Sequence, residues 1–379
     1  METEVNNDLV MAPAEELPSA LVEEILLRSP KKSLAQFRAV SKPWNAIWED
    51  KIFLNKYFAR ARPEFILRTN SQICSVAISL DDDHVEVRDI TSHIPFRIGM
   101  HSILVHCDGF LLSGMWKKGF AVWNPWLSKK RFVENHEFRF CGVGYDNTRP
   151  ETGYKIFGVY FCADDATSKL YPKVAIYECK TDAWRFIRFN APSEEQDWRV
   201  PQLDSIVSLN GNLYWISYHS PEYSIRSFDF SEETFKTFCL LPASSEEDFG
   251  YTQVLGVFEG DRFSVLRQSY LTGKIEILVT KQNIERKAVV WINLMTVSIP
   301  NLPRLQQKCL ACQPSYFVDN KKKLFVCTCD EAGNACIYIV ERDVFKKIPI
   351  ESVVDLWPSH LTYIPSFVPI PLNQQGSQV

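Results

Sequence analysis

The sequence predicts a mainly β fold, in which a long β-propeller-like domain follows a small N-terminal α-helical module. Apolar residues recur at the helical spacing of three and four chiefly between Leu17 and Arg62. From about Ile73 onward, apolar and polar residues alternate in short runs that are broken by turn signals. A weak repeat of roughly 50 residues runs through this second part, and that spacing is typical of one four-stranded propeller blade.

The N-terminal module reads as three short helices. Pro18 is tolerable in the first turn, where its missing N–H has no partner, and Pro30 ends the first helix. The apolar residues at helical spacing are Leu21, Val22, Ile25, Leu26, Leu34, Phe37, Val40, Trp44, Ile47 and Trp48. A module of this size is marginal for an independent core, so its apolar surface is completed either by the β domain or by a partner.

The charge of the module differs from that of the whole chain. Residues 17–62 contain nine Lys and Arg and four Asp and Glu, which gives about +5, whereas the formal net charge of the chain is −4. An apolar surface with a basic rim suits an acidic partner, because charge complementarity speeds encounter and fixes register.

The repeat in the β-rich part is a strand, a polar turn and a second strand that carries an aromatic residue. Residues 175–187 and 225–238 show it most clearly, and looser copies lie at 120–125, 275–279 and 337–345. We expect a propeller of about six blades. A β-sandwich of many short strands is the alternative, but it gives no reason for the spacing.

The N-terminal module resembles the F-box motif in the order and spacing of its residues. The resemblance is carried by Leu17-Pro18, Leu21, Glu24-Ile25-Leu26, Arg28, Pro30, Lys32-Ser33-Leu34, Phe37-Arg38, Val40, Lys42 and Trp44. The chain departs from the motif at Ser29, where leucine is usual, and at Ser41, where cysteine is usual. Both changes remove apolar contact.

Most of the chain after about residue 100 resembles the plant F-box-associated interaction domain, which is kelch-like. The carrying motifs are Cys107-Asp108-Gly109-Phe110, Val122-Trp123-Asn124-Pro125, Gly144-Tyr145-Asp146, Leu209-Asn210-Gly211-Asn212, Ser227-Phe228-Asp229-Phe230, Gly260-Asp261-Arg262-Phe263, Pro314-Ser315-Tyr316-Phe317 and Tyr363-Ile364-Pro365-Ser366. We therefore expect an F-box module at 14–62 and a propeller-like domain at 63–372, with disordered ends at 1–13 and 373–379.

This resemblance implies a substrate-recognition subunit of a Skp-cullin-F-box ubiquitin ligase. The F-box would dock on a Skp-type adaptor, and through it on cullin, while the β domain holds an unknown target protein for ubiquitination and degradation. By the same resemblance, the candidate adaptor contacts are Leu17, Pro18, Leu21, Ile25, Leu26, Leu34, Val40 and Trp44. The alternatives are a scaffold without ubiquitin transfer and a sugar-binding or enzymatic propeller protein.

Several other classes receive no support from the sequence. The acidic balance does not favour a nucleic-acid partner. The acidic N-terminal residues differ from a secretory signal, and no apolar run approaches the length of a membrane helix. The 11 cysteines are scattered, which indicates free thiols in the cytoplasm or nucleus.

Catalytic motifs are absent from the sequence, so we expect a non-catalytic chain without a cofactor. The cluster to weigh as a zinc site is Cys309, Cys312, Cys327 and Cys329, with Cys336 beyond it. Cys309 and Cys312 have a ligand spacing. Alternation places Cys327 and Cys329 on one strand face, where cysteine acts as a small hydrophobe, and we expect no metal site.

The target-binding residues are not specified by any motif. Recognition residues usually lie on loops that a rigid scaffold positions. The polar, irregular segments Cys162–Lys169, Glu194–Val200 and Glu246–Tyr251 are the candidate recognition loops.

Overall fold

The computed structural model of the chain divides into two compact units, Met1–Tyr57 and Phe58–Val379. Its described residues are 17–29, 33–34, 36–37, 41–79, 84–91, 103–115, 119–127, 129–134, 139–149, 153–163, 170–187, 206–219, 222–243, 251–282, 289–300, 302–305 and 313–370. Among them, no helix is both long and apolar enough to cross a membrane.

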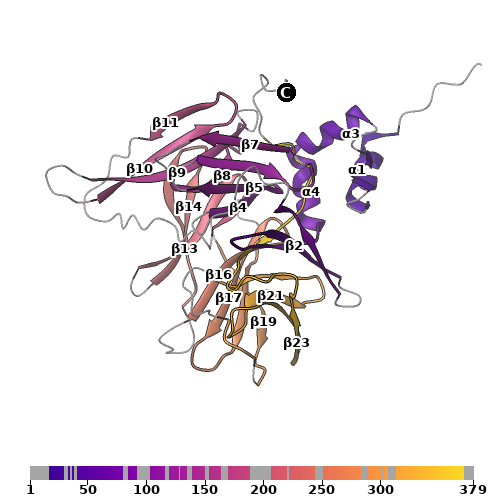
Figure 1. The fold of residues 1–379 in the computed structure, drawn as a ribbon, viewed down its shortest axis with the longest axis vertical. Coiled ribbons are helices and arrows are strands. Elements are labelled where there is room, and N and C mark those ends of the chain that lie inside the picture. The colour runs from indigo at the N-terminus through magenta and orange to yellow at the C-terminus, as the bar shows by residue number, and fades with distance from the viewer. Residues whose placement is uncertain are drawn as a thin grey trace, which may run out of the picture. The chain divides into compact units, whose positions relative to one another are not determined.

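The second unit contains six antiparallel sheets of four strands each (Figure 1). The first sheet consists of β24 (Ser359–Tyr363), β1 (Glu64–Arg68), β2 (Ile73–Ile78) and β3 (Val85–Asp89). The second consists of β4 (Ile103–Cys107), β5 (Phe110–Met115), β6 (Gly119–Asn124) and β7 (Lys129–Glu134). The third consists of β8 (Arg139–Tyr145), β9 (Tyr154–Ala163), β10 (Leu170–Glu178) and β11 (Ala183–Ile187).

The remaining three sheets follow in chain order. The fourth consists of β12 (Val207–Leu209), β13 (Asn212–His219), β14 (Glu222–Asp229) and β15 (Thr234–Leu240). The fifth consists of β16 (Tyr251–Phe258), β17 (Arg262–Ser269), β18 (Ile275–Thr280) and β19 (Trp291–Val297). The sixth consists of β20 (Ser315–Val318), β21 (Leu324–Cys329), β22 (Ala335–Glu341) and β23 (Val344–Pro349).

These sheets are the blades of a six-bladed propeller, which confirms the predicted fold class. The first strands of successive blades contact one another around the ring, as between β4 and β8, β16 and β20, and β24 and β4. The ring closes inside the first blade, where β24 pairs antiparallel with β1 in the register Glu64↔Tyr363 to Arg68↔Ser359. The two ends of the domain are thus held in one sheet.

The sequence repeat corresponds to the third and fourth strands of a blade: residues 175–187 span β10 and β11, and residues 225–238 span β14 and β15. The looser copies begin in the third strands β6, β18 and β22. The Asp-Gly and Asn-Gly pairs of the motifs form hairpin turns between the first and second strands of two blades. Asp108 and Gly109 have φ of 47° and 82°, and Asn210 and Gly211 have φ of 48° and 77°. Positive φ at both central residues is the requirement of the two-residue hairpin turn that Asn-Gly and Asp-Gly favour.

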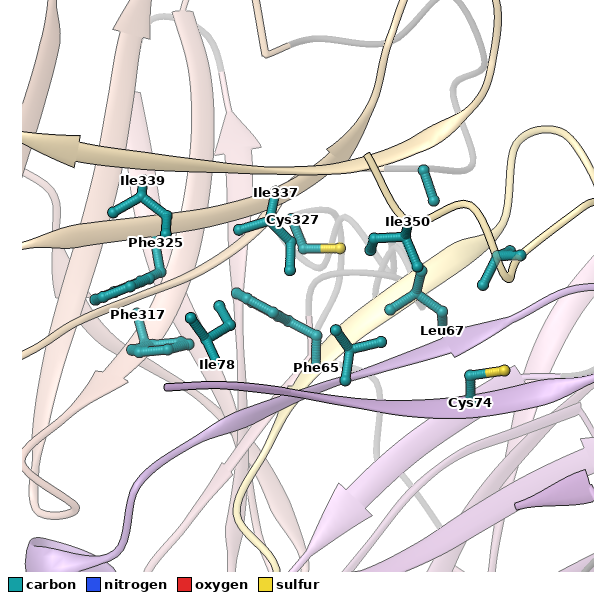
Figure 2. Packing of buried hydrophobic residues seen from close by; sticks show 13 residues of the cluster. Phe65, Leu67, Cys74, Ile78, Phe317, Phe325, Cys327, Ile337, Ile339 and Ile350 are labelled. Atoms are coloured by element: carbon teal, nitrogen blue, oxygen red, sulfur yellow. The ribbon is translucent and has the colours of Figure 1, made fainter. Parts of the chain in front are cut away.

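The apolar core lies between neighbouring blades. One cluster joins the first blade, through Phe65 and Leu67, to the sixth blade, through Phe317, Phe325 and Ile337 (Figure 2). Further clusters join the fifth blade to the sixth, the third to the fourth, the first to the second and the fourth to the fifth. The second and third blades meet through aromatic contacts such as Phe120 with Tyr177, whose ring centroids are 5.4 Å apart. Each blade is therefore stabilised by the sheets on its two sides.

The strand order gives the propeller two unlike faces. Turns between the first and second and between the third and fourth strands of each blade lie on one face, which we call the hairpin face. Turns between the second and third strands, and the connections between blades, lie on the opposite face, which we call the connecting face. The chain enters β1 at Glu64 and leaves β24 at Tyr363, both on the hairpin face.

Polar contacts join neighbouring blades along the hairpin face. The hydroxyl of Tyr154 donates to Asp108 Oδ2 at 2.6 Å, which joins the third blade to the second. Lys155 Nζ lies 2.9 Å from Glu233 Oε1, which joins the third blade to the fourth, and both side chains are largely buried. Burial makes such contacts costly to break, because a lone charge would remain.

The segment after β24 fastens the ring on this face. The buried Asn124 at the end of β6 donates from Nδ2 to the carbonyls of Ser366 and Val368, at 3.0 Å in each case. The hydroxyl of Ser366 donates to the carbonyl of Asp108. Phe367 packs edge-on against Trp126, with ring centroids 6.0 Å apart. The C-terminal segment of the domain is thus bonded to the second blade.

His360 in β24 is a buried titratable group at the contact between the first and sixth blades. Its Nδ1 lies 2.9 Å from the hydroxyl of Ser315 in β20. Burial lowers the pKa of His360 from 6.5 to about 4, so the neutral ring is the folded form.

Replacing Asn124 with alanine should weaken the fastening of the C-terminal segment. Two buried carbonyls lose their donor, so we expect the free energy of unfolding to fall by about 2–4 kcal/mol. Urea unfolding followed by tryptophan fluorescence measures this loss. The control is Asn293→Ala in β19, where the side chain is exposed and the expected change is within about 0.5 kcal/mol. Equal stability of the two variants would contradict the assigned role of Asn124.

Acidification should destabilise the propeller through His360. Its folded pKa of about 4 lies below the ordinary histidine pKa of 6.5, so between these values the unfolded chain binds the proton more readily. The stabilising contribution is present above pH 6.5 and is lost as the pH falls toward 4, with a slope of about 1 kcal/mol per pH unit. Urea unfolding across this range should show a shallower slope in His360→Asn than in the unchanged chain. Parallel slopes would show that His360 does not contribute.

Candidate functional site

The N-terminal unit is built from short helices. Their bounds are α1 (Ser19–Arg28), α3 (Lys42–Ala46), the 3-10 turn η1 (Ile47–Glu49) and α4 (Lys51–Arg60), of which the residues to Tyr57 belong to this unit. Ser33, Leu34, Gln36 and Phe37 are also helical. Pro18 is the N-cap of α1, and its carbonyl accepts from the amide of Leu21 at 2.9 Å.

The core of this unit is small and aromatic. Trp48 is fully buried, with its ring centroid 5.2 Å from that of Phe53 and 5.0 Å from that of Tyr57, both at steep angles. Edge-to-face packing of this kind adds about 0.5–1.5 kcal/mol per pair beyond area burial. The aliphatic part of the core is Val22, Leu26, Leu34 and Leu54, all at most 6% exposed.

Helix α1 carries a second set of apolar residues that points to solvent. Leu17, Leu21 and Ile25 are 53%, 53% and 39% exposed. Leu21 and Ile25 are four residues apart on one face of α1, and Leu17 precedes the N-cap Pro18 at the same spacing in the sequence. We call these three residues the α1 stripe. An apolar row of this kind on a small helical unit is typical of a protein-binding surface.

The eight predicted adaptor contacts therefore occupy different environments. Leu17, Leu21 and Ile25 form the α1 stripe, and Pro18 is exposed beside them. Leu26 and Leu34 are 1% exposed and lie in the core of the unit. Trp44 is half-buried and packs edge-on against Phe37, with centroids 5.2 Å apart. Val40 lies outside the described residues.

The two departures from the F-box pattern serve helix ends. The hydroxyl of Ser29 donates to the carbonyl of Ile25 at 2.6 Å, and so satisfies one of the last acceptors of α1. Ser41 is the N-cap of α3, and its carbonyl accepts from the amide of Asn45 at 3.0 Å, although its side chain makes no capping bond. Ser29 therefore exchanges apolar contact for a defined end of α1.

Ion pairs hold α1 in place beside the stripe. Glu24 pairs with Arg28 one turn later at 2.6 Å, and Glu23 pairs with Lys56 of α4 at 2.7 Å. All four side chains are partly or largely exposed, so each pair contributes little to stability. Only the pair of Glu23 with Lys56 links α1 to another helix, since Glu24 and Arg28 both lie in α1.

The three candidate recognition loops belong to one face of the propeller. They connect β9 to β10, β11 to β12 and β15 to β16, so the strands that flank all three end at the connecting face. The segments themselves lie for the most part outside the described residues. The strand order thus groups three stretches that are far apart in the sequence.

The cysteines considered as zinc ligands lie in different environments. Cys309 and Cys312 are outside the described residues. Cys327 and Cys336 are fully buried in apolar clusters on opposite faces of the sixth blade. Burial, with Cys329 and Cys336 nearby, raises the pKa of Cys327 well above its usual value, which favours the thiol over the ligating thiolate. Within the described part of the chain, no three metal-ligating side chains converge.

Comparison with known proteins matches the two units to two families. Residues 15–56 match the F-box domain, and residues 64–370 match the F-box associated beta propeller domain. A putative F-box protein of Arabidopsis thaliana is 47% identical over 376 residues, which cover 94% of this chain and 99% of that protein. Protein SUPPRESSOR OF NIM1 1 of the same plant is 43% identical, with 94% and 99% covered.

A third relative from Arabidopsis thaliana, a putative F-box/kelch-repeat protein, is 39% identical over 94% of this chain and 99% of its own length. These matches confirm the resemblance that the sequence motifs carry. The chain belongs to the F-box proteins with an F-box associated β-propeller domain, which are substrate-recognition proteins.

Proposed function

We propose that this chain is the receptor subunit of a Skp-cullin-F-box ubiquitin ligase, and that the α1 stripe is its contact with the Skp-type adaptor. The observation that supports this proposal is the exposure of Leu17, Leu21 and Ile25 within the stretch that matches the F-box domain. Exposed apolar side chains do nothing for the stability of a free helical unit, so a partner that covers them is the simplest reason for their presence.

Burial of the α1 stripe would give association a favourable term. Covering a leucine or isoleucine fully contributes about 1.5–3 kcal/mol, so three half-exposed side chains contribute several kcal/mol together. The excess of basic residues in 17–62 would add attraction toward an acidic adaptor surface. Leu26 and Leu34 support the interaction indirectly, because they hold the helices in position from inside the unit.

The propeller in this proposal binds the target through its connecting face. The hairpin face is where the chain enters and leaves the domain and where the blades are bonded to one another. The connecting face carries the long connections between blades, and loops of this kind tolerate sequence change without loss of the scaffold. The target would then be held near a ubiquitin-charged enzyme, and proximity alone would raise the rate of transfer.

The double variant Leu21→Asp, Ile25→Asp should lose adaptor binding. Two charges would then enter an apolar contact, so we expect the Kd for a purified Skp-type adaptor to rise at least tenfold. Isothermal titration of the full-length chain with the adaptor measures the change.

The matched control is Val344→Asp in β23 of the propeller, where the side chain is 67% exposed and adaptor affinity should not change. Circular dichroism should show the same helix content in the double variant as in the unchanged chain, because both residues face solvent. Leu26→Ala, in contrast, should reduce stability by about 2–4 kcal/mol. Adaptor binding that survives both aspartates would exclude the α1 stripe as the docking surface.

Ubiquitin transfer separates the ligase receptor from a scaffold that only recruits partners. The chain, adaptor, cullin and a ubiquitin-charged enzyme would be combined with a model target protein tethered to the propeller. Transfer to the target that depends on Leu21 and Ile25 supports the ligase role. Adaptor binding without transfer would favour the scaffold.

A further inference from the structure

The connection between β23 and β24 is held in place at several points. Ile350 lies in the core cluster between the first and sixth blades, beside Leu67 in Figure 2. The amide of Val353 donates to the carbonyl of Ile350 at 3.1 Å, and Val353 is also buried in that cluster. The start of this connection is therefore part of the core.

Two neighbouring turns fix the rest of the connection. From the turn between β1 and β2, Gln72 Nε2 donates to the carbonyl of Ser352 at 3.1 Å, and the hydroxyl of Ser71 donates to Asp355 Oδ2 at 2.7 Å. The amide of Trp357 donates at 2.8 Å to the carbonyl of Gly333, in the turn between β21 and β22.

The contact between Trp357 and Gly333 requires glycine. A Cβ at Gly333 would lie 2.7 Å from Cε2 of the Trp357 ring, which is too close for any other residue. Gly333 also has φ of 93°, and Trp357 itself has φ of 57°. A tryptophan in the left-handed region is held there by its surroundings, so the connection has one defined conformation.

This fixed connection presents two apolar side chains to solvent. Val354 is 83% exposed and Leu356 is 56% exposed, although Val353 between Ser352 and Val354 is buried. Neither side chain is needed by the core that Ile350 and Val353 complete. A rigid loop that exposes apolar groups is preorganised for binding, because little conformational entropy remains to be lost on association.

The charge around these side chains is negative on balance, although basic residues at its edge include Arg68, which donates to Ser359, and Lys347. The three adjoining segments, 69–72, 330–334 and 350–358, contain Asp330, Glu331, Glu351 and Asp355 and no lysine, arginine or histidine. Asp330 is paired with Lys347 at 3.0 Å. Glu331 and Glu351 are exposed, and the hydrogen bond from Ser71 lowers the pKa of Asp355, so this carboxylate is ionised at neutral pH.

We propose that these three segments form a docking site on the connecting face for a basic segment of the target protein that carries aliphatic or aromatic residues. Val354 and Leu356 contact the apolar residues of that segment, while Glu331, Glu351 and Asp355 attract its lysines and arginines. This inference rests on the proposed function and deepens it, because it says which kind of target segment these three segments of the connecting face would bind.

The target is unidentified, so the probe is a library of random dodecapeptides displayed on phage and selected on the immobilised full-length chain. We expect the enriched peptides to combine lysine or arginine with leucine, isoleucine or phenylalanine. Synthetic copies, followed by fluorescence anisotropy, should bind at least tenfold more weakly to the double variant Val354→Asp, Leu356→Asp. Their affinity should also fall with added salt.

Two further variants separate the contribution of charge to peptide affinity from that of the apolar pair. Glu331→Lys, Glu351→Lys should weaken the same peptides while leaving the apolar pair in place. Val344→Asp, which is exposed at the other end of the sixth blade near the hairpin face, should leave their affinity unchanged. Both altered sites are exposed, so thermal unfolding of all variants should match that of the unchanged chain.

The failure of this inference is distinguishable from failure of the proposed function. Adaptor binding of the Val354→Asp, Leu356→Asp variant should equal that of the unchanged chain, because the α1 stripe is intact. A library that enriches no peptide, or enriches acidic ones, overturns the docking site and leaves adaptor binding untouched. Peptides that bind the double variant as tightly as the unchanged chain overturn it as well.

Discussion

The pairing of β24 with β1 is the constraint on which the propeller depends. It joins Tyr363 to Glu64 and so closes the ring across almost the whole domain, and no other strand pair can replace it. Closing so long a loop costs entropy that the five pairs in this register do not offset by themselves. The core cluster around Phe65 and Phe317, and the bonds from Asn124 to the C-terminal segment, supply the remaining stabilisation. The ring is consequently a cooperative structure, whose stability depends on its last residues as much as on its first.

Closure from the hairpin face leaves the two faces with different roles. On the hairpin face, buried contacts such as Lys155 with Glu233 and Tyr154 with Asp108 bind blade to blade, so substitutions there act on stability. The connecting face carries long links between blades and the fixed turn with Val354 and Leu356. A scaffold that is held together on one side can present binding residues on the other without loss of the fold.

The sequence predicted the repeating part of this architecture and missed its closure. Five blades repeat a pattern of strand, polar turn and aromatic strand, which gave the blade spacing and the expectation of about six blades. The first blade lacks that pattern, although its third and fourth strands, β2 and β3, are consecutive in the chain. Its innermost strand, β24, comes from the far end of the chain, and no local periodicity reports such pairing. In the F-box unit, helical spacing gave the right set of apolar residues. It did not separate the exposed Leu21 from the buried Leu26, since both are leucines on the same short helix and spacing alone does not say which apolar residues a small unit leaves uncovered. The sequence did not mark Val354 and Leu356 as exposed, because two apolar residues shortly before a proline look like buried core residues.

The two exposed apolar surfaces carry charge of opposite sign, and this difference decides what each can bind. Burying two or three aliphatic side chains contributes only a few kcal/mol, which does not by itself overcome the entropy cost of association. Complementary charge must therefore supply part of the affinity and most of the discrimination. The basic excess of residues 17–62 disfavours a basic ligand at the α1 stripe, and the carboxylates around Leu356 disfavour an acidic one on the connecting face. An acidic adaptor and a basic target segment would then not compete for the same surface.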